Sequence, residues 1–304
     1  MTPNQVVGNL QGIFPPVVTP FNRRGDVDEG LFRANIGRYS GIGLGGILVA
    51  GSTGEAPYLT ERERLRLTEI ARGLVKPPEV LIVGTGLEST RETIRLSREA
   101  IARGADALLV LPPNYYKARM DGPTLTAHYR ALADAVNRPI VIYSIPQFSG
   151  IDIPTETVAR LSRHRNIVAL KESSGNLRFV RQILHRVRPG FRVLVGSVAI
   201  LLDALRAGAA GAVLAQAVFA PDLCVGVYEA FGQRRLKVAR ELQRRLLPLA
   251  TKIAVPYGVA GIKAAMELAG YAGGPPRPPL LPVDAAARRQ IAAALRESRA
   301  GLEF

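Results

Sequence analysis

The chain has 304 residues, of which 47% are hydrophobic, and it carries a formal net charge of +15. This length allows one large domain or two ordinary ones, and no apolar run approaches the roughly 20 residues that cross a bilayer, so we expect no membrane partner. The charge invites a nucleic-acid partner, but the Arg pairs are scattered and no RNA-binding aromatic signature accompanies them, so a solvated Arg-rich surface is favoured.

Eight short apolar runs recur along the first 220 residues. They are apolar throughout rather than at every second residue, which indicates strands that are covered on both faces. The predicted strands are Ile13–Thr19, Gly46–Ala50, Val80–Gly84, Ala107–Leu111, Ile140–Tyr143, Ile167–Leu170, Val193–Val195 and Ala212–Ala215.

Segments of helical character lie between and after these runs. Two of them open with a capping-box signature, Thr60 with Glu63 and Ser89 with Glu92. The predicted helices are Leu31–Tyr39, Thr60–Leu74, Thr90–Ala102, Leu125–Val136, Thr155–Leu161, Leu177–Val187, Ile200–Ala207, Leu223–Phe231, Leu236–Leu247, Val259–Ala269 and Ala285–Arg299.

Strands that alternate with helices imply parallel pairing, because parallel strands need crossover connections. Eight such units fit an α/β fold of the (β/α)8 TIM barrel type, which takes about 250 residues. We therefore expect a catalytic barrel over residues 1–220 and a C-terminal helical domain over 221–304, with Gly273–Pro279 as a loop. A doubly wound open sheet is the alternative, and periodicity alone does not exclude it.

One glycine pattern resembles a dinucleotide-binding fingerprint. Gly41–Gly46 reads GIGLGG and fits G-x-G-x-x-G. That fingerprint needs a strand before it and a helix after it, whereas here a helix precedes and a strand follows. We interpret the segment as a helix-to-strand turn.

Cysteine and histidine usage narrows the chemistry. Cys224 is the only cysteine, so no internal disulfide forms, a cytoplasmic location is favoured, and the thiol is interpreted as a core residue. The N-terminal ten residues lack the charged start and apolar core of a signal peptide. His128, His164 and His185 are widely spaced and form no metal-binding motif, so we expect no metal site.

Polar groups follow several predicted strands, and in a barrel the carboxyl ends of the strands form one rim where catalytic groups gather. Lys171 follows Ile167–Leu170, although Lys accounts for only six of the 40 basic residues. Tyr143 ends the preceding strand, and the loop GSTGE, Gly51–Glu55, follows an earlier one. We expect these groups to meet at the barrel mouth.

A lysine amine condenses with a ketone to form a Schiff base, and burial favours the neutral amine that this step requires. Tyr143 is the candidate for proton transfer, and the amides and hydroxyls of Ser52 and Thr53 suit a carboxylate. For each residue a structural alternative stands: a solvated strand end for Lys171, a buried tyrosine with a satisfied hydroxyl, and an ordinary capped loop.

The chain resembles the dihydrodipicolinate synthase / N-acetylneuraminate lyase family of pyruvate-dependent class I aldolases. The motifs that carry the resemblance cover most of the chain, namely PPVVTPF (Pro15–Phe21), GSTGE, YSIP (Tyr143–Pro146), LKESSGN (Leu170–Asn176) and GGPPRPPL (Gly273–Leu280). The resemblance implies a (β/α)8 barrel with a C-terminal helical domain, a homotetramer or homodimer, and no metal or organic cofactor, because the substrate is held covalently on Lys171.

The resemblance also assigns roles to residues. It implies Lys171 as the Schiff-base lysine and Tyr143 as the proton shuttle, with Ser52 and Thr53 holding the pyruvate carboxylate. Tyr115 matches a tyrosine that the family inserts into a neighbouring subunit's site. The other matched or pocket-shaping positions are Ser173, Gly196, Ser197 and Val213.

Departures from the family pattern narrow the substrate. Phe148 stands where dihydrodipicolinate synthases carry an arginine for the aldehyde's carboxylate, and Val198 and Ala199 replace the Asp-Glu pair of sialic-acid lyases. Ser144, in place of the usual Asn, and the segment Gly150–Pro154 look like 4-hydroxy-2-oxoglutarate aldolase, whereas Thr53 replaces an Asn of the mammalian-type loop.

These observations predict an aldolase that cleaves 4-hydroxy-2-oxoglutarate to pyruvate and glyoxylate, or forms it. The alternatives are dihydrodipicolinate synthase, which condenses pyruvate with aspartate semialdehyde, and an aldolase for 2-keto-3-deoxy sugar acids. From another class, a non-catalytic binding protein with a nucleic-acid partner is disfavoured by the intact set Lys171, Tyr143, Ser52 and Thr53.

Overall fold

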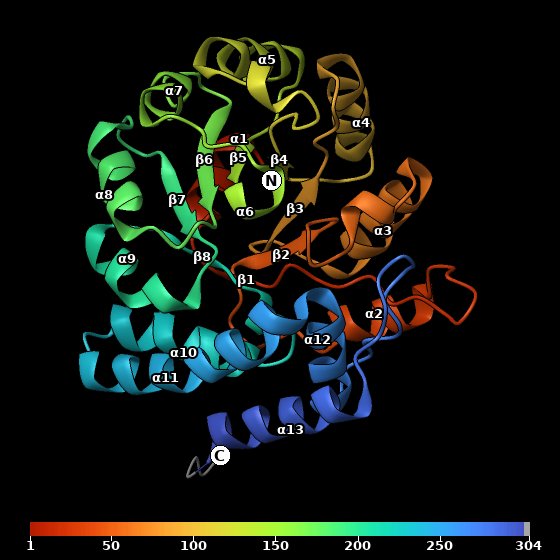
Figure 1. The fold of residues 1–304 in the computed structure, drawn as a ribbon. Coiled ribbons are helices and arrows are strands. Elements are labelled where there is room, and N and C mark those ends of the chain that lie inside the picture. Colours follow the sequence, from red (N-terminus) through yellow and green to blue (C-terminus); the bar gives the residue numbers. More distant parts are fainter. Residues whose placement is uncertain (301–304) are drawn as a thin grey trace.

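The computed structural model describes residues 1–300 and shows a barrel of parallel strands surrounded by helices (Figure 1). The strands lie in the order β1-β8-β7-β6-β5-β4-β3-β2, and a bridge between Pro16 and Leu48 brings β1 next to β2. They are β1 (Gly12–Phe14), β2 (Gly46–Val49), β3 (Val80–Gly84), β4 (Ala107–Val110), β5 (Ile140–Ser144), β6 (Ile167–Glu172), β7 (Arg192–Val195) and β8 (Gly211–Val213). The predicted (β/α)8 barrel is confirmed, and the open doubly wound sheet is wrong.

Helices cover the outside of the barrel, and a further group follows the last strand. The helices between strands are α2 (Glu29–Gly37), α3 (Glu61–Leu74), α4 (Thr90–Ala102), α5 (Gly122–Ala135), α6 (Pro146–Ser149), α7 (Thr155–Leu161), α8 (Leu177–Arg186) and α9 (Leu201–Ala207). After β8 come α10 (Pro221–Gly232), α11 (Leu236–Leu249), η5 (Ala250–Ala254), α12 (Val255–Leu268) and α13 (Ala285–Arg299). The division into two domains at residue 220 stays a prediction, and residues 301–304 of the second lie outside the described residues.

The predicted strand bounds are wrong at two informative places. The first strand stops at Phe14 instead of Thr19, because Pro15 and Pro16 have no N–H to donate to a ladder. The sixth strand does not end before Lys171 but continues through Glu172, since these residues pair with β5 and with β7.

An N-terminal helix that the sequence did not indicate closes one end of the barrel. Helix α1 (Pro3–Asn9) starts with a capping box. The Thr2 side chain accepts a hydrogen bond from the Gln5 N–H, and the Gln5 side chain accepts one from the Thr2 N–H. Its Val6, with Leu10 just beyond, packs into the same cluster as the inward side chains of the strands. The amino-terminal ends of β5 and β6 lie beside it, so the carboxyl-end rim is the open one.

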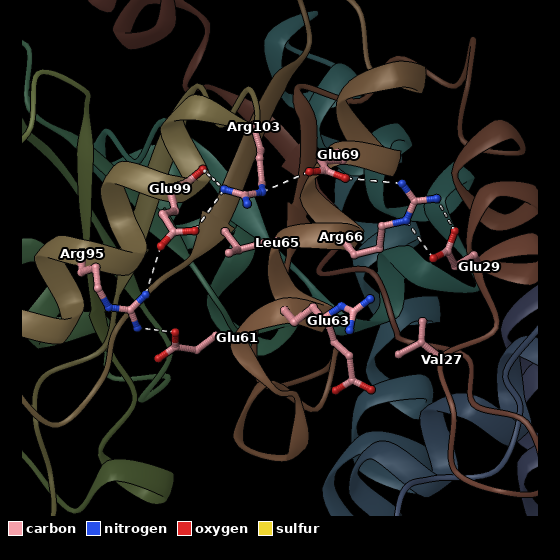
Figure 2. A pocket seen from close by; sticks show the side chains of 11 residues that line it. Val27, Glu29, Glu61, Glu63, Leu65, Arg66, Glu69, Arg95, Glu99 and Arg103 are labelled. Carbon is pink, nitrogen blue, oxygen red and sulfur yellow. Dashed lines mark hydrogen bonds and ion pairs between the residues drawn. The ribbon is translucent and has the colours of Figure 1, made fainter.

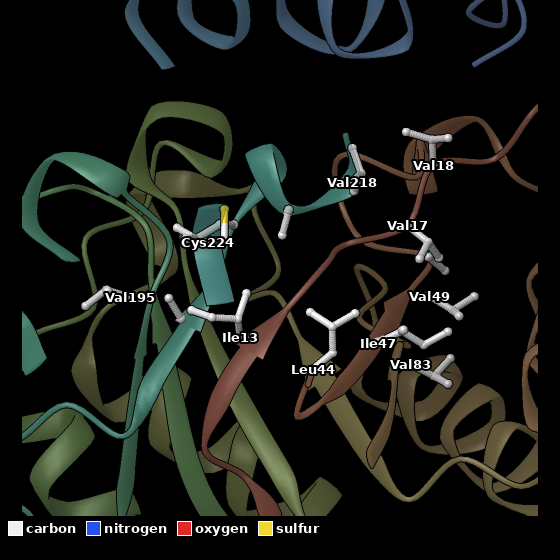
Figure 3. Packing of buried hydrophobic residues seen from close by; sticks show 14 of the residues in the cluster. Ile13, Val17, Val18, Leu44, Ile47, Val49, Val83, Val195, Val218 and Cys224 are labelled. Atoms are coloured by element: carbon white, nitrogen blue, oxygen red, sulfur yellow. The ribbon is translucent and has the colours of Figure 1, made fainter. Parts of the chain in front are cut away.

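The larger part of the core lies between the strands and the helices. Figure 3 shows Ile13 of β1 and Ile47 of β2 in this layer together with Cys224 of α10. Cys224 is fully buried and its burial raises the pKa of the thiol, so its interpretation as a core residue is confirmed.

The glycine pattern Gly41–Gly46 connects α2 to β2, as predicted, and has no dinucleotide-binding context. Gly46 sits so close to β3 that an added Cβ would lie 2.0 Å from the Val80 carbonyl oxygen. Glycine is therefore required by strand packing at this position.

One of the two predicted capping boxes is complete. The Thr60 hydroxyl accepts from the Glu63 N–H at 3.2 Å, and Glu63 accepts from the Thr60 N–H at 2.8 Å. At α4 the Ser89 hydroxyl accepts from the Glu92 N–H, but the Glu92 carboxylate bonds to Arg95 at 2.6 Å instead of returning to the cap.

The predicted break after Leu247 is wrong. Helix α11 includes Pro248, continues through the wider turns of η5, and leads directly into α12, where Gly258 leaves the helical conformation with φ 51°. The segment Gly273–Pro279 is a loop, as predicted. None of the helices in residues 1–300 combines the length and the apolar character that crossing a membrane would require.

Candidate active site

Lys171 lies inside β6 and is 4% exposed, so its interpretation as a solvated strand end is wrong. Its neighbours across the sheet are Tyr143 on β5 and Leu194 on β7. Pairing on both sides keeps this residue in the strand, where its side chain alternates with that of Leu170 in the outer layer.

The Lys171 amine faces the Tyr143 ring, with Nζ 4.0 Å from the ring centroid. Tyr143 is 5% exposed and belongs to the cluster inside the barrel. Its hydroxyl lies 3.3 Å from the Oγ of Ser52, which stands in the loop after β2. An amine, a phenol and an alcohol thus stand in sequence at the carboxyl ends of three strands, and such groups can pass protons to one another.

The loop Gly51–Glu55 is a tight turn that follows β2. The Gly54 N–H donates to the Gly51 carbonyl at 3.0 Å, and the Glu55 N–H donates to the Ser52 carbonyl at 3.1 Å. The hydrogen bonds found in residues 1–300 leave the amide N–H groups of Ser52 and Thr53 without a protein acceptor. Unpaired amides in a turn form a nest that suits a carboxylate.

Four further predicted residues lie on or beside the ends of β6, β7 and β8. The Ser173 N–H donates to the Ser144 carbonyl at 2.9 Å, which holds the chain after Lys171 against β5. A Cβ on Gly196 would lie 2.0 Å from the Ser173 Oγ, so a larger residue would displace that serine. Ser197 approaches Gly175 on the same side, and Val213 lines the barrel interior.

Glu172 supports this arrangement from the opposite face of β6. It is fully buried, and burial raises the pKa of its carboxyl group. Its Oε1 accepts from the Ser174 N–H at 2.8 Å, which fixes the turn that follows Ser173.

Tyr115 and Phe148 do not join the site within this single chain. Their side chains are 77% and 70% exposed. Tyr115 packs edge-on against Tyr116, and its N–H donates to the Glu88 carboxylate at 2.9 Å. Their roles in a neighbouring subunit's site and in substrate choice stay predictions.

The structure adds residues that the sequence did not single out. A cavity of about 370 Å³ opens beside Ser52 and Tyr143 and is also lined by Arg64 and Glu88. The Glu88 carboxylate accepts hydrogen bonds from the backbone N–H groups of Asn114 and Tyr115. Glu88 comes shortly after β3. It could have been predicted as a site residue by the rule that selected Ser52, Tyr143 and Lys171, namely their position at or after the end of a strand. Arg64 faces inward from α3, and burial lowers the pKa of its guanidinium.

Metal-binding side chains do not gather in the described part of the chain. Residues 1–300 hold no group of three or more His, Cys, Asp or Glu side chains that could bind a metal ion.

Known proteins are similar to this chain in sequence and in fold. The model of the dihydrodipicolinate synthetase family matches residues 9–298. A 4-hydroxy-tetrahydrodipicolinate synthase from Methanopyrus kandleri is 37% identical over 274 residues, which cover 89% of this chain and 90% of the relative. A probable mitochondrial 4-hydroxy-2-oxoglutarate aldolase from Emericella nidulans is 35% identical over 297 residues, or 95% and 94% of the two chains.

A solved structure has the same fold as this chain. A prophage protein of the dihydrodipicolinic acid synthase family from E. coli K12, crystallised in complex with pyruvate, matches with a TM-score of 0.90 at 29% identity. The match covers 95% of this chain and 99% of that one. Because the family match spans nearly the whole chain and the relatives exceed a third in identity, this chain belongs to the dihydrodipicolinate synthetase family, whose members are lyases and synthases that act through a Schiff base.

Proposed function

We propose that this enzyme cleaves 4-hydroxy-2-oxoglutarate to pyruvate and glyoxylate, or catalyses the reverse condensation, through a Schiff base on Lys171. The observation that carries the proposal is the buried amine of Lys171 against the Tyr143 ring, with the Tyr143 hydroxyl next to Ser52. Membership of the family supports the chemistry, and the relative from Emericella nidulans bears the name of this activity.

The reaction follows from the positions of these groups. The Lys171 amine attacks the C2 ketone, and Tyr143 gives its proton to the hydroxyl of the adduct, which leaves as water while the protonated imine forms. The Tyr143 phenolate then takes the proton of the C4 hydroxyl, the bond between C3 and C4 breaks, its electron pair moves to the imine, and glyoxylate is released. Tyr143 passes this proton to C3 of the enamine and takes one back when water hydrolyses the imine, so that pyruvate, the free amine and the phenol are restored.

Other residues bind and orient the substrate in this scheme. The unpaired amides of Ser52 and Thr53 hold the C1 carboxylate, and Ser173, Gly196 and Ser197 shape the pocket around the cleaved bond. The high exposure of Tyr115 supports a role in the site of a neighbouring copy, where it extends the proton path, so a homodimer or homotetramer is the functional form. Val213 closes the inner wall, and Phe148, which is exposed in the single chain, stands at the sequence position that would contact the aldehyde.

A second candidate is the synthase reaction between pyruvate and aspartate semialdehyde. The Methanopyrus kandleri relative is named for the product of that reaction, which favours it. Against it, Phe148 offers no charge to the carboxylate of the aldehyde. A sugar-acid aldolase is disfavoured because the buried Val198 and the neighbouring Ala199 give no hydrogen bonds to hydroxyl groups.

The decisive test is pyruvate release from 4-hydroxy-2-oxoglutarate, followed with a lactate dehydrogenase couple. We expect release by wild type and by Lys252→Ala, which removes an exposed lysine, but none by Lys171→Ala. Borohydride should trap pyruvate on wild type and fail to do so on Lys171→Ala. Turnover by folded Lys171→Ala would contradict the mechanism.

A parallel assay with pyruvate and aspartate semialdehyde separates the two candidates. We expect faster turnover of 4-hydroxy-2-oxoglutarate than of aspartate semialdehyde. The reverse order, with pyruvate trapping intact, would assign the chain to the synthases.

A further inference from the structure

Glu55, the last residue of the loop Gly51–Glu55, forms a fully buried ion pair. Its Oε1 lies 2.6 Å from the Lys263 Nζ, and both side chains are 1% exposed. Glu55 itself has a left-handed backbone, with φ 57°, which ends the turn and directs the chain into α3. A buried charge at such a position indicates a requirement beyond turn formation, because non-glycine residues rarely adopt this conformation.

The partner of Glu55 comes from the helices that follow the barrel. Lys263 lies on α12, and its ammonium also donates to the Pro275 carbonyl at 2.9 Å. The second carboxylate oxygen of Glu55 accepts from the Arg277 N–H at 2.8 Å. The loop after β2 is therefore tied to two segments more than 200 positions away in sequence.

Arg277 extends the connection around the loop. Its guanidinium donates to the Gly25 and Tyr58 carbonyls and bonds to both oxygens of Glu63. Both cations also lie against the ring of Phe21, whose centroid is 4.5 Å from the Lys263 Nζ and 4.2 Å from the Arg277 Cζ. Charges and backbone contacts thus surround the base of the loop on several sides.

Stability alone does not account for a pair of this kind. Taking two charges out of water costs about as much as their attraction returns, so well-packed apolar residues would serve the fold equally well. The location of the pair is more informative, because Glu55 donates its own N–H to the Ser52 carbonyl and so fixes the residue that precedes the unpaired Thr53 amide.

We propose that Glu55 and Lys263 are positioning residues, which hold the amides of Ser52 and Thr53 in the orientation that binds the substrate carboxylate. Through them the position of α12 sets the shape of the carboxylate site in the barrel mouth. This inference rests on the proposed function, since it requires that the loop bind the carboxylate of a 2-oxo acid.

The test compares borohydride trapping of two ketones on Lys171, pyruvate and acetone, of which only pyruvate has a carboxylate. In Lys263→Met we expect the pyruvate concentration for half-maximal trapping to rise about tenfold or more, because small misplacements of binding groups cost up to about 10²-fold. Acetone trapping should stay at the wild-type level. The matched control is Lys252→Met, which removes the exposed lysine paired with Glu297, and it should leave both unchanged.

The double variant Glu55→Gln with Lys263→Met separates positioning from folding. It buries no unpaired charge, so its melting temperature should exceed that of Lys263→Met, while its preference for pyruvate over acetone should stay below that of wild type. A wild-type preference in either folded variant would overturn the proposal, as would equal losses for both ketones or failure of both variants to fold. Absence of pyruvate trapping on wild type would instead refute the proposed function, and the carboxylate role with it.

Discussion

Lys171 and Tyr143 occupy paired positions on β6 and β5, so strand register alone brings the amine to the phenol ring. The register also sets the opposite face, where Ser144 pairs with Glu172 outside the barrel. Alternation along the two strands therefore separates the reactive groups from the carboxylate that supports the turn after β6. The chemistry therefore depends on the register of these two residues. A shift of either strand by one residue would move its reactive side chain from the inner to the outer face of the barrel.

Tyr143→Phe should reduce turnover by about 10²–10⁴-fold, because a positioned acid–base group contributes that much. The variant keeps the ring that packs on Lys171, so pyruvate trapping by borohydride should persist. Steady-state rates and trapping measured on the same preparation would check both expectations.

Tyr129→Phe is the matched control for a buried tyrosine. Its hydroxyl donates to the Val110 carbonyl at 2.9 Å on the outer side of the barrel. We expect a stability loss of about 1–3 kcal/mol, from the unsatisfied carbonyl, with near-normal turnover. A rate loss in Tyr143→Phe no larger than in this control would remove Tyr143 from proton transfer.

Elements with strong local signals could be predicted from the sequence, often to the residue. Helix α4 and helix α13 have the predicted bounds, because polar caps and apolar spacing lie within each segment. The contacts of a residue whose neighbours come from distant segments of the chain could not be predicted in this way. Lys263 lies within the predicted helix Val259–Ala269, and nothing near it in sequence shows that Glu55 is its partner.

At the start of α3, Glu63 completes the capping box and pairs with Arg277. The hydrogen bond from Arg277 is the largest cause that lowers the pKa of Glu63 from its ordinary 4.5. A carboxyl whose pKa is lower in the folded state stabilises the fold above its unfolded pKa, and this contribution disappears as the pH falls through the folded value. Glutamine preserves the box and removes the charge.

We therefore expect Glu63→Gln to be less stable than wild type at neutral pH, with a difference that shrinks as the pH falls below 4.5. Urea unfolding of both proteins over this range would measure it. Glu156→Gln, which breaks an exposed pair with Arg186, should stay within about 0.5 kcal/mol of wild type. A difference for Glu63→Gln that is independent of pH would contradict the linkage.

At the scale of the molecule, the barrel could be predicted because eight apolar runs alternate with helical segments, and this pattern persists over the first 220 residues. Two features could not be predicted from the sequence. They are the N-terminal helix α1, which closes one end of the barrel, and the continuous connection from α11 to α12. Val6 and Leu10 are too few to give a helical period. Residues 248–258 fall between two predicted helices, whereas α11 continues through Pro248 into η5 and α12 and departs from helical dihedral angles only at Gly258.

Ion pairs link part of the Arg-rich surface into a row. Figure 2 shows charged side chains of α3 and α4 linked in a row, in which Arg103 bonds to Glu69 and to Glu99. Arg66 continues the row from Glu69, and Arg95 continues it from Glu99. Isolated exposed pairs contribute only about 0–1 kcal/mol each, but networks gain in importance as temperature rises.

Arg103→Met should therefore lower stability by about 1 kcal/mol at low ionic strength, because it interrupts the network at its centre while the methionine retains apolar contact with the helices. The loss should narrow at about 1 M salt, where the screening length falls to about 3 Å. Arg91→Met provides the control, since Arg91 is 93% exposed and only 3.9 Å from its nearest carboxylate, on Glu92. Both variants lose one positive charge, so subtracting their melting temperatures cancels the change in net charge. Equal melting temperatures for the two at low salt would show that the row of ion pairs contributes no more than scattered surface charge.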